Sequence, residues 1–255
     1  MIEKRGVLSS TETVQSDGFR LRGLEVTRVE ALSDVVFGFA LTLVGVSLGV
    51  PRTFDQLLEA LREFPAFALC FAILILLWHD HYIFFRRYGL EDNRTIFLNS
   101  LLLFIVILYV YPLKFLLSLL VTLWTTNGAP MARLADGKLA LMITWDQSRW
   151  LTLIFGVGYA AVYAVLAILY EHADQLRGEL HLNAFEIFET RERIVRYLLL
   201  CGVGILAAVS ALALGGYSSR WVPWLFVLIP IIRITHSWIA RRQREKLKAI
   251  PAQPF

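Results

Sequence analysis

The stretch RVEALSDVVFGFALTLVGVSL, from Arg28 to Leu48, indicates what kind of protein this chain is. From Val35 onward the stretch is almost entirely apolar, as a helix in a lipid bilayer must be. Its beginning, however, carries the polar residues Arg28, Ser33 and Asp34. Because a charged side chain inside a bilayer is unfavourable, we expect Asp34 to lie near the interface or to have a polar partner.

The composition of the chain is that of a polytopic membrane protein. Apolar residues make up 57% of its 255 residues and charged residues only 18%, whereas soluble domains are roughly 45–50% apolar. Cys70 and Cys201 lie in apolar runs and have neither zinc-site nor disulfide-framework spacing. We therefore expect an all-α integral membrane protein that needs no cofactor.

The apolar segments predict six transmembrane helices per chain, since a spanning helix needs roughly 20 apolar residues. They cover about 30–50, 65–85, 95–123, 148–170, 194–215 and 221–240. In the third segment we expect a break or an interfacial turn at Pro112. The predicted organisation is a largely disordered N-terminal arm (1–24), a transmembrane domain (25–240) and a basic tail (241–255).

The Lys and Arg residues predict how the chain is oriented. Of the 25, 17 lie on the side that holds both termini, six lie on the other side and two lie within spans. Because positive charge accumulates on the cytoplasmic side, both termini are expected in the cytoplasm and the protein in the plasma (inner) membrane. The net charge of +4 then reflects topology and gives no reason to expect nucleic-acid binding.

The first apolar segment has two parallel stripes when it is drawn as a helix. The bulky stripe contains Val35, Phe39, Leu43, Val46 and Val50, and the small stripe contains Gly38, Thr42, Gly45 and Gly49. Small residues at this spacing allow helices to approach closely in lipid. One interpretation is a lipid-facing side next to a packing side; the other gives the bulky stripe a role of its own.

Polar residues from three segments are expected at one depth, on the side where the chain starts. The second segment ends in WHDHYIFFRR (78–87), and the third begins there as well. Because such groups need partners when buried, we predict one buried hydrogen-bond network that fixes the helix packing. Its members would be Arg28, Ser33, Asp34, His79, His81 and Asn99. The alternative is a water-exposed set at the interface.

The residues from Arg28 to Leu43 carry a resemblance to a known family. Arg-x-x-x-Leu-Ser-Asp followed by Val-x-Phe-x-x-Ala-x-Thr-Leu resembles the Arg-x-x-x-Phe-Ser-Asp signature of the endolysosomal potassium channels, the transmembrane protein 175 family. Trp78 with His79 and His81, followed by Asn99 and Pro112, also resembles that family's second and third helices. The specific match covers roughly 28–112, and six spans fit the prokaryotic single-repeat form.

This resemblance implies a potassium-permeable cation channel that works as a homotetramer, in which the first helix of each copy lines the pore. The pore constriction would be formed by Phe39, Leu43 and Val46, with the hydroxyl of Thr42 beside it. The polar network would brace that helix from the cytoplasmic side. An apolar constriction of this kind can gate by dewetting. The partners would be other copies of the chain, the bilayer and potassium ions.

Two other function classes fit the sequence less well. An enzyme is not expected, because only five His are present and neither G-x-S-x-G nor H-E-x-x-H occurs. A secondary transporter, or a non-conducting membrane protein of the same fold, is the alternative, with Lys114 and Arg233 as charges within its spans. The stretch FGVGYA (155–160) lacks the rest of a potassium filter, so Gly156 and Gly158 are interpreted as packing glycines.

Overall fold

A computed structural model describes residues 18–47, 49–125, 129–133 and 138–217, together with Ile231 and Thr235. Its elements are α1 (Arg28–Val46), α2 (Phe54–Tyr88), α3 (Asn93–Thr125), β1 (Met131–Arg133), β2 (Leu139–Leu141), α4 (Trp145–Gln175), α5 (Ala184–Leu214) and the short 3-10 helix η1 (Gly215–Tyr217). Five of the described helices are long and apolar enough to cross a membrane. Nearly all of the sixth expected span (221–240) and the whole tail (241–255) lie outside the described residues.

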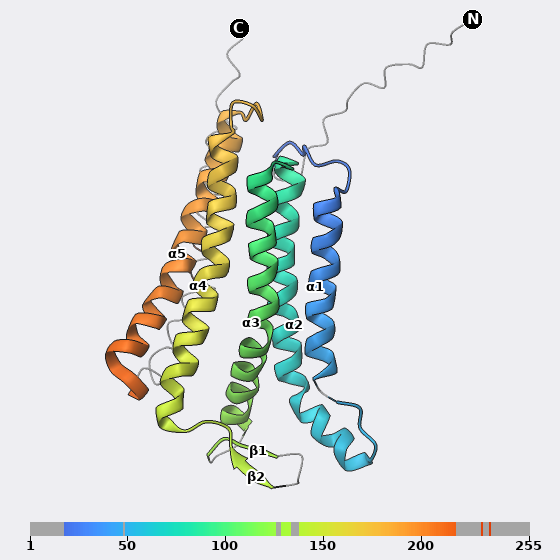
Figure 1. Cartoon of the computed structure of the whole chain (residues 1–255), viewed down its shortest axis with the longest axis vertical. Coiled ribbons are helices and arrows are strands. Elements are labelled where there is room, and N and C mark those ends of the chain that lie inside the picture. The colour runs from blue at the N-terminus through green and yellow to red at the C-terminus, as the bar shows by residue number, and fades with distance from the viewer. Residues whose placement is uncertain are drawn as a thin grey trace, which may run out of the picture.

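The long helices run side by side, and successive helices point in opposite directions (Figure 1). Helix α3 packs against α1, α2 and α4, and α4 pairs along its length with α5. The small antiparallel hairpin of β1 and β2 lies at one end, which we call the hairpin end. At the opposite end, called here the basic end, α1, α3 and α5 begin while α2 and α4 finish (Figure 1).

Local sequence signals fix most helix ends. Helices α1, α4 and α5 each begin at a capping box, in which the side chains of the N-cap residue and of the third helical residue satisfy each other's backbone N–H groups. The three pairs are Thr27–Glu30, Thr144–Gln147 and Asn183–Glu186. Helix α2 ends at Gly89, whose φ of 59° is the left-handed conformation that favours glycine.

The expected break in the third segment is wrong, because α3 continues through Pro112 as one helix. A proline removes one backbone donor, but neighbouring helices in a membrane bundle compensate for this loss. The second segment also begins earlier than expected, at Phe54, and includes Pro65. The first turns of α2 swing out beneath α1 (Figure 1).

The α4–α5 pair is packed through small residues. A Cβ on Gly156 would lie 2.7 Å from the Gly204 carbonyl oxygen and from the Ala208 nitrogen, so the two backbones meet directly. A Cβ on Gly158 would lie 2.3 Å from the Tyr109 ring of α3. The interpretation of Gly156 and Gly158 as packing glycines is confirmed.

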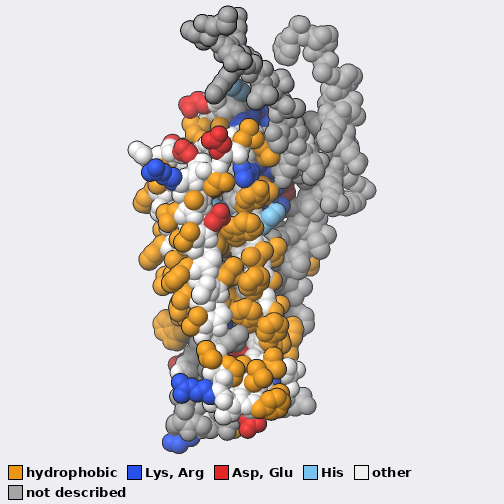
Figure 2. Space-filling model, turned by 90° about the vertical axis from the view of Figure 1, so that its right-hand side faces the viewer, with side chains coloured by type: hydrophobic (Ala, Val, Ile, Leu, Met, Phe, Trp, Pro, Cys, Tyr) orange, Lys and Arg blue, Asp and Glu red, His pale blue; other side chains and the backbone are white. Residues whose placement is uncertain are grey.

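The outer surface of the bundle fits a lipid environment. Figure 2 shows the side formed by α1, where apolar side chains make a broad band and charged side chains gather near the two ends. Among the exposed large apolar side chains of the bundle are Val35, Phe39 and Val46 of α1 and Phe104 of α3. Apolar surface on this scale is typical of a protein that meets lipid or further protein.

Candidate pore helix and its supporting network

Helix α1 has one face buried in its own chain and one face open. Ser33, Phe37, Ala40 and Val44 form the buried face, each less than 3% exposed. The opposite face carries the bulky stripe; Phe39 is 58% and Val46 71% exposed. No other part of the described chain covers this face, so the predicted stripe is available to line a pore, to meet lipid or to contact another copy.

The expected pore residues are not all placed alike on that helix. Phe39, Thr42 and Val46 are exposed, whereas Leu43 is half-buried and packs at the edge of the core. The Thr42 hydroxyl donates to the Gly38 carbonyl oxygen at 2.9 Å, which leaves its oxygen free to accept or to coordinate. The open face therefore combines apolar side chains with a hydroxyl oxygen.

Part of the predicted polar network exists as a buried chain of hydrogen bonds across three helices. The Asn99 side-chain amide donates to Ser33 Oγ at 2.9 Å, and Ser33 donates in turn to the Val29 carbonyl oxygen at 2.7 Å. His81 Nε2 lies 2.8 Å from Asn99 Oδ1 and donates to it, because an amide oxygen can only accept. Asn99 thus joins α1, α2 and α3 near the basic end.

The other expected members are placed differently. Asp34 accepts a hydrogen bond of 2.7 Å from the indole Nε1 of Trp78, so its hydrogen-bond donor is the tryptophan. Arg28 and His79 are exposed, and no hydrogen bond within the described residues joins them to this network. Asp80, which separates the two histidines, is buried and interacts electrostatically with Arg193 of α5.

The hairpin end of α1 has a contact that the sequence did not predict. Helix α1 has no basic residue in its last turn, although a cation there would oppose the negative end of the helix dipole. Lys114 of α3 supplies that cation: its ammonium donates to Ser47 Oγ and lies 3.9 Å from a Glu63 carboxylate oxygen. Lys114 therefore lies beside the end of α1, although α3 itself continues beyond it to Thr125, and Arg233, the other charge considered for a transporter, lies outside the described residues.

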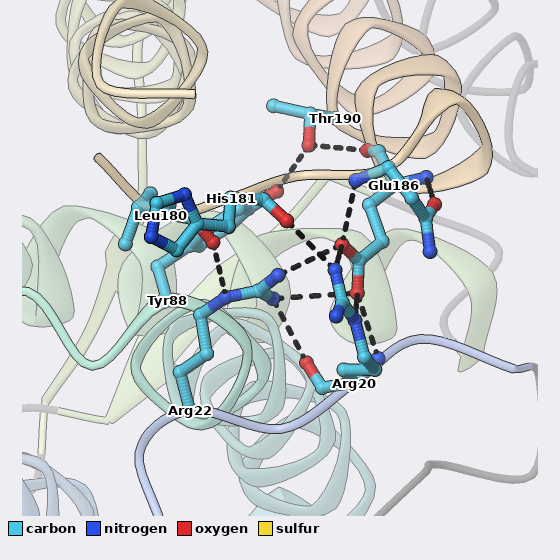
Figure 3. Close-up of polar contacts among 8 residues, drawn as sticks. Arg20, Arg22, Tyr88, Leu180, His181, Glu186 and Thr190 are labelled. Carbon is cyan, nitrogen blue, oxygen red and sulfur yellow. Dashed lines mark hydrogen bonds and ion pairs between the residues drawn. The ribbon is translucent and has the colours of Figure 1, made fainter. Parts of the chain in front are cut away.

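Three charged residues at the basic end form a cluster that sequence reasoning missed. Arg20 and Arg22 of the N-terminal arm both contact the fully buried carboxylate of Glu186, at the start of α5 (Figure 3). The only local signals were the capping pattern Asn183-x-x-Glu186 and the pair Arg20-x-Arg22. Neither signal says that the two segments meet.

The turn between α2 and α3 carries a second polar contact. Asp92 Oδ1 accepts from the Thr95 hydroxyl at 2.5 Å, and Asp92 Oδ2 lies 2.9 Å from Nε2 of His172, at the end of α4. Partial burial alone would raise the pKa of Asp92, but the hydrogen bonds from Thr95 and His172 outweigh it and lower that pKa. The carboxylate is therefore the favoured form at neutral pH.

A metal centre finds no support in the part of the chain that the structure describes. No group of three or more His, Cys, Asp and Glu side chains lies close enough there to hold an ion. Cys70 and Cys201 are free thiols on α2 and α5. What the described site offers is an open apolar helix face held from behind by hydrogen bonds.

Comparison with known proteins places the signature region in one family. The family model described as "Endosomal/lysosomal potassium channel TMEM175" matches residues 28–109. A protein named potassium channel from Marivirga tractuosa is 37% identical over 204 residues, which cover 76% of this chain and 78% of that relative. A potassium channel from Chamaesiphon minutus is 30% identical over 105 residues, 38% of this chain and 52% of that relative.

Two solved structures are similar in fold. A crystal structure of a variant of the potassium channel MtTMEM175, in complex with a nanobody–MBP fusion protein, has a TM-score of 0.76 at 32% identity. That similarity covers 90% of this chain and all of the other. A structure of a lysosomal potassium-selective channel TMEM175 homolog from Chamaesiphon minutus has a TM-score of 0.51 at 22% identity, over 82% of this chain and 96% of the other. At that identity, the second likeness concerns the fold alone.

Proposed function

This chain belongs to the TMEM175 family of endosomal and lysosomal potassium channels, and on that premise we propose that it forms a potassium-permeable channel in a membrane. The family consists of channels, and the expectation that the chain is not an enzyme is confirmed by that membership. In this proposal potassium is the permeant ion, and several copies of the chain surround one pore.

The observation that carries the proposal is the open face of α1, inside the stretch that matches the family. Phe39, Thr42 and Val46 lie on that face, and the opposite face is anchored to α2 and α3. A helix anchored in this way can expose its other face to a central pore between several copies of the chain. We propose a homotetramer, because one helix per chain can enclose a pore only when several chains assemble.

In this arrangement Phe39, Leu43 and Val46 narrow the pore, and Thr42 supplies oxygen beside the apolar ring. A narrow apolar stretch excludes water and therefore ions, so small widening permits conduction. The Ser33–Asn99–His81 chain of hydrogen bonds, with the Asp34–Trp78 contact, holds the helix at the depth that the constriction requires. The basic end faces the cytoplasm of a plasma membrane, as the Lys and Arg count favours.

The test is voltage-driven potassium flux into liposomes that contain the purified full-length chain. Replacing Phe39 by Ala removes the ring from the constriction, so flux should rise several-fold. Phe104→Ala is the matched control, because Phe104 is an equally exposed phenylalanine (64% against 58%) on α3. An equal rise in both variants, or no change in a folded Phe39→Ala protein, would contradict the constriction. No flux from any folded version would favour a transporter or a non-conducting protein.

A further inference from the structure

Residues 18–24, which we call the strap, are packed onto the basic end of the bundle. The prediction that the N-terminal arm is largely disordered is therefore wrong for residues 18–24. Residues 1–17 lie outside the described residues. Phe19 is fully buried: its ring meets Tyr88 edge-on at 5.7 Å, and the Arg87 guanidinium lies 4.4 Å from its centre. Burial of such a side chain stabilises by about 1.5–3 kcal/mol.

The strap also satisfies the open end of α2. The last carbonyl groups of a helix have no partner within it. Here the backbone N–H groups of Arg22 and Gly23 donate to the Arg86 carbonyl oxygen at 3.2 and 3.1 Å. The approach is so close that a Cβ on Gly23 would lie 2.4 Å from the Phe85 carbonyl oxygen. The strap is therefore held against α2 by direct backbone contact.

Glu186 ties the strap to α5. Its Oε1 accepts from the Arg20 backbone N–H at 3.0 Å, and its Oε2 lies 2.8 Å from Arg22 Nη2 and 3.1 Å from Arg20 Nη2 (Figure 3). The arginines also donate to the loop before α5, to the carbonyl oxygens of His181 at 2.7 Å and Leu180 at 2.9 Å. A fully buried carboxylate strongly favours keeping such partners.

A second contact holds α5 against α2 at the same level. The Tyr88 hydroxyl lies 2.7 Å from Thr190 Oγ1, which donates to the Glu186 carbonyl oxygen at 2.7 Å (Figure 3). The phenol of Tyr88 is therefore the donor to Thr190. These hydrogen bonds connect the strap to the end of α2 and to the beginning of α5.

The strap is joined to α1 by a very short link. Only Glu25 and Val26 lie between Leu24 and Thr27, the N-cap of α1, so the Cα atoms of Leu24 and Thr27 are three residue steps, at most about 11 Å, apart. The Arg86 guanidinium holds the near end of this link, by donating to the carbonyl oxygens of Gly23 at 2.8 Å and Leu24 at 3.0 Å. A shift of the strap must therefore be followed by the start of α1.

We propose that Glu186 is a positioning residue for α1: through Arg20, Arg22 and the strap it fixes where the helix begins relative to α5. This inference rests on the proposed function for its effect on conduction. Helix α5 is held along its length by α4, whereas α1 packs on α2 and α3 with one face open. The strap therefore connects the α4–α5 pair to the proposed pore helix: it contacts α5 through Glu186 and continues into α1 after a short link.

The test uses Glu186→Gln in the full-length protein. Glutamine keeps the capping box, as Gln147 does at the start of α4, but it removes the charge that the arginines contact. Hydrogen bonds to charged groups stabilise more than neutral ones. Amide hydrogen exchange over Arg20–Gly23 should therefore become at least about tenfold faster, and exchange in the first turns of α1 should become faster with it.

Two further variants separate the charge contact from general effects. Glu179→Gln makes the same change of charge at an exposed residue of the loop before α5 and should leave exchange and flux unchanged. The double variant Arg20→Gln, Arg22→Gln should speed exchange more than Glu186→Gln, because it leaves the buried carboxylate unpaired and also removes the hydrogen bonds to His181 and Leu180. Adding Glu186→Gln to it should recover part of that loss, because the triple variant buries no unpaired charge. Potassium flux should change at least twofold in the cluster variants.

The two proposals fail in different ways. A faster strap with unchanged exchange in α1, in a protein that keeps its assembly, would overturn the positioning role. Unchanged flux in cluster variants whose α1 exchange is faster would overturn its link to conduction. Absence of potassium flux in the folded wild-type protein would refute the proposed function alone, because the exchange experiment needs no current.

Discussion

Gly156 of α4 and Gly204 of α5 lie so close together that a Cβ on either would come within 2.7 Å of the other helix's backbone. Gly38 of α1 and Gly49, just beyond its C-terminal end, by contrast have no atom of the described chain within 4 Å of a Cβ built on them, and Gly45 of α1 meets only the Phe67 ring at 3.8 Å. Small residues therefore line both the α4–α5 pair and α1, and of these two regions only the α4–α5 pair uses them for close packing within the described chain.

The difference divides the bundle into a closed part and an open part. The α4–α5 pair has its tightest contact inside one chain, so its geometry is fixed as soon as the chain folds. Helix α1 has both its small stripe and most of its bulky stripe uncovered. Under the proposed function, neighbouring copies complete that surface, and its packing depends on assembly.

The largest expected difference is in stability, when a glycine is replaced by alanine in the closed part or in the open part. Gly156→Ala should lower the free energy of unfolding by about 1–3 kcal/mol, because the new Cβ meets backbone atoms that cannot move away. Gly38→Ala should be neutral or stabilising by up to about 1 kcal/mol, because it improves helix propensity in open space. Thermal unfolding in detergent would measure both.

The oligomeric state of the same two variants tests the division into an open and a closed part further. If the small stripe of α1 packs against another copy, Gly38→Ala should weaken the oligomer while the single chain stays stable. Equal losses of chain stability in Gly38→Ala and Gly156→Ala would contradict the division into an open and a closed part.

An effect of similar size is expected from the polar contacts that hold the buried face of α1. Asn99→Leu leaves Ser33 and His81 without their side-chain partner, and an unsatisfied buried group costs about 1–3 kcal/mol. Ser100→Ala, at the next residue, is the control, because the Ser100 hydroxyl is exposed and donates only to its own helix. Similar stability of the two variants would show that the network does not anchor α1.

The smallest effect is expected from the Asp92 turn, which joins the open and closed parts at the basic end. Since the pKa of Asp92 is lowered in the folded protein, its carboxylate stabilises the fold above the ordinary carboxyl pKa of about 3.9. This contribution should disappear as the pH falls through the lowered value. The difference in melting temperature between wild type and Asp92→Asn should persist from pH 7 to about 4 and shrink below that. Its loss already at pH 5 would contradict this.

Much of α1 could be predicted from its residues alone. The apolar run predicted a helix, and the helical period placed Phe39 and Val46 on one stripe and Thr42 on the neighbouring stripe, all of which the structure leaves exposed. The position of Leu43 differed, because the period fixes an angle but not how far a neighbouring helix reaches around it. The continuous course of α3 through Pro112 also depended on neighbours.

By itself, the sequence determined that the described chain consists of membrane-length helices and carries the family signature, because hydrophobic length, helix period and motif spacing are local properties. Only the tertiary structure decided which polar groups become partners. Asn99 meets Ser33 across 66 residues, and Arg20 meets Glu186 across 166. The physical reason is that a hydrogen bond needs atoms about 3 Å apart, and only the packing of whole helices brings such distant segments together and removes the water that would otherwise compete.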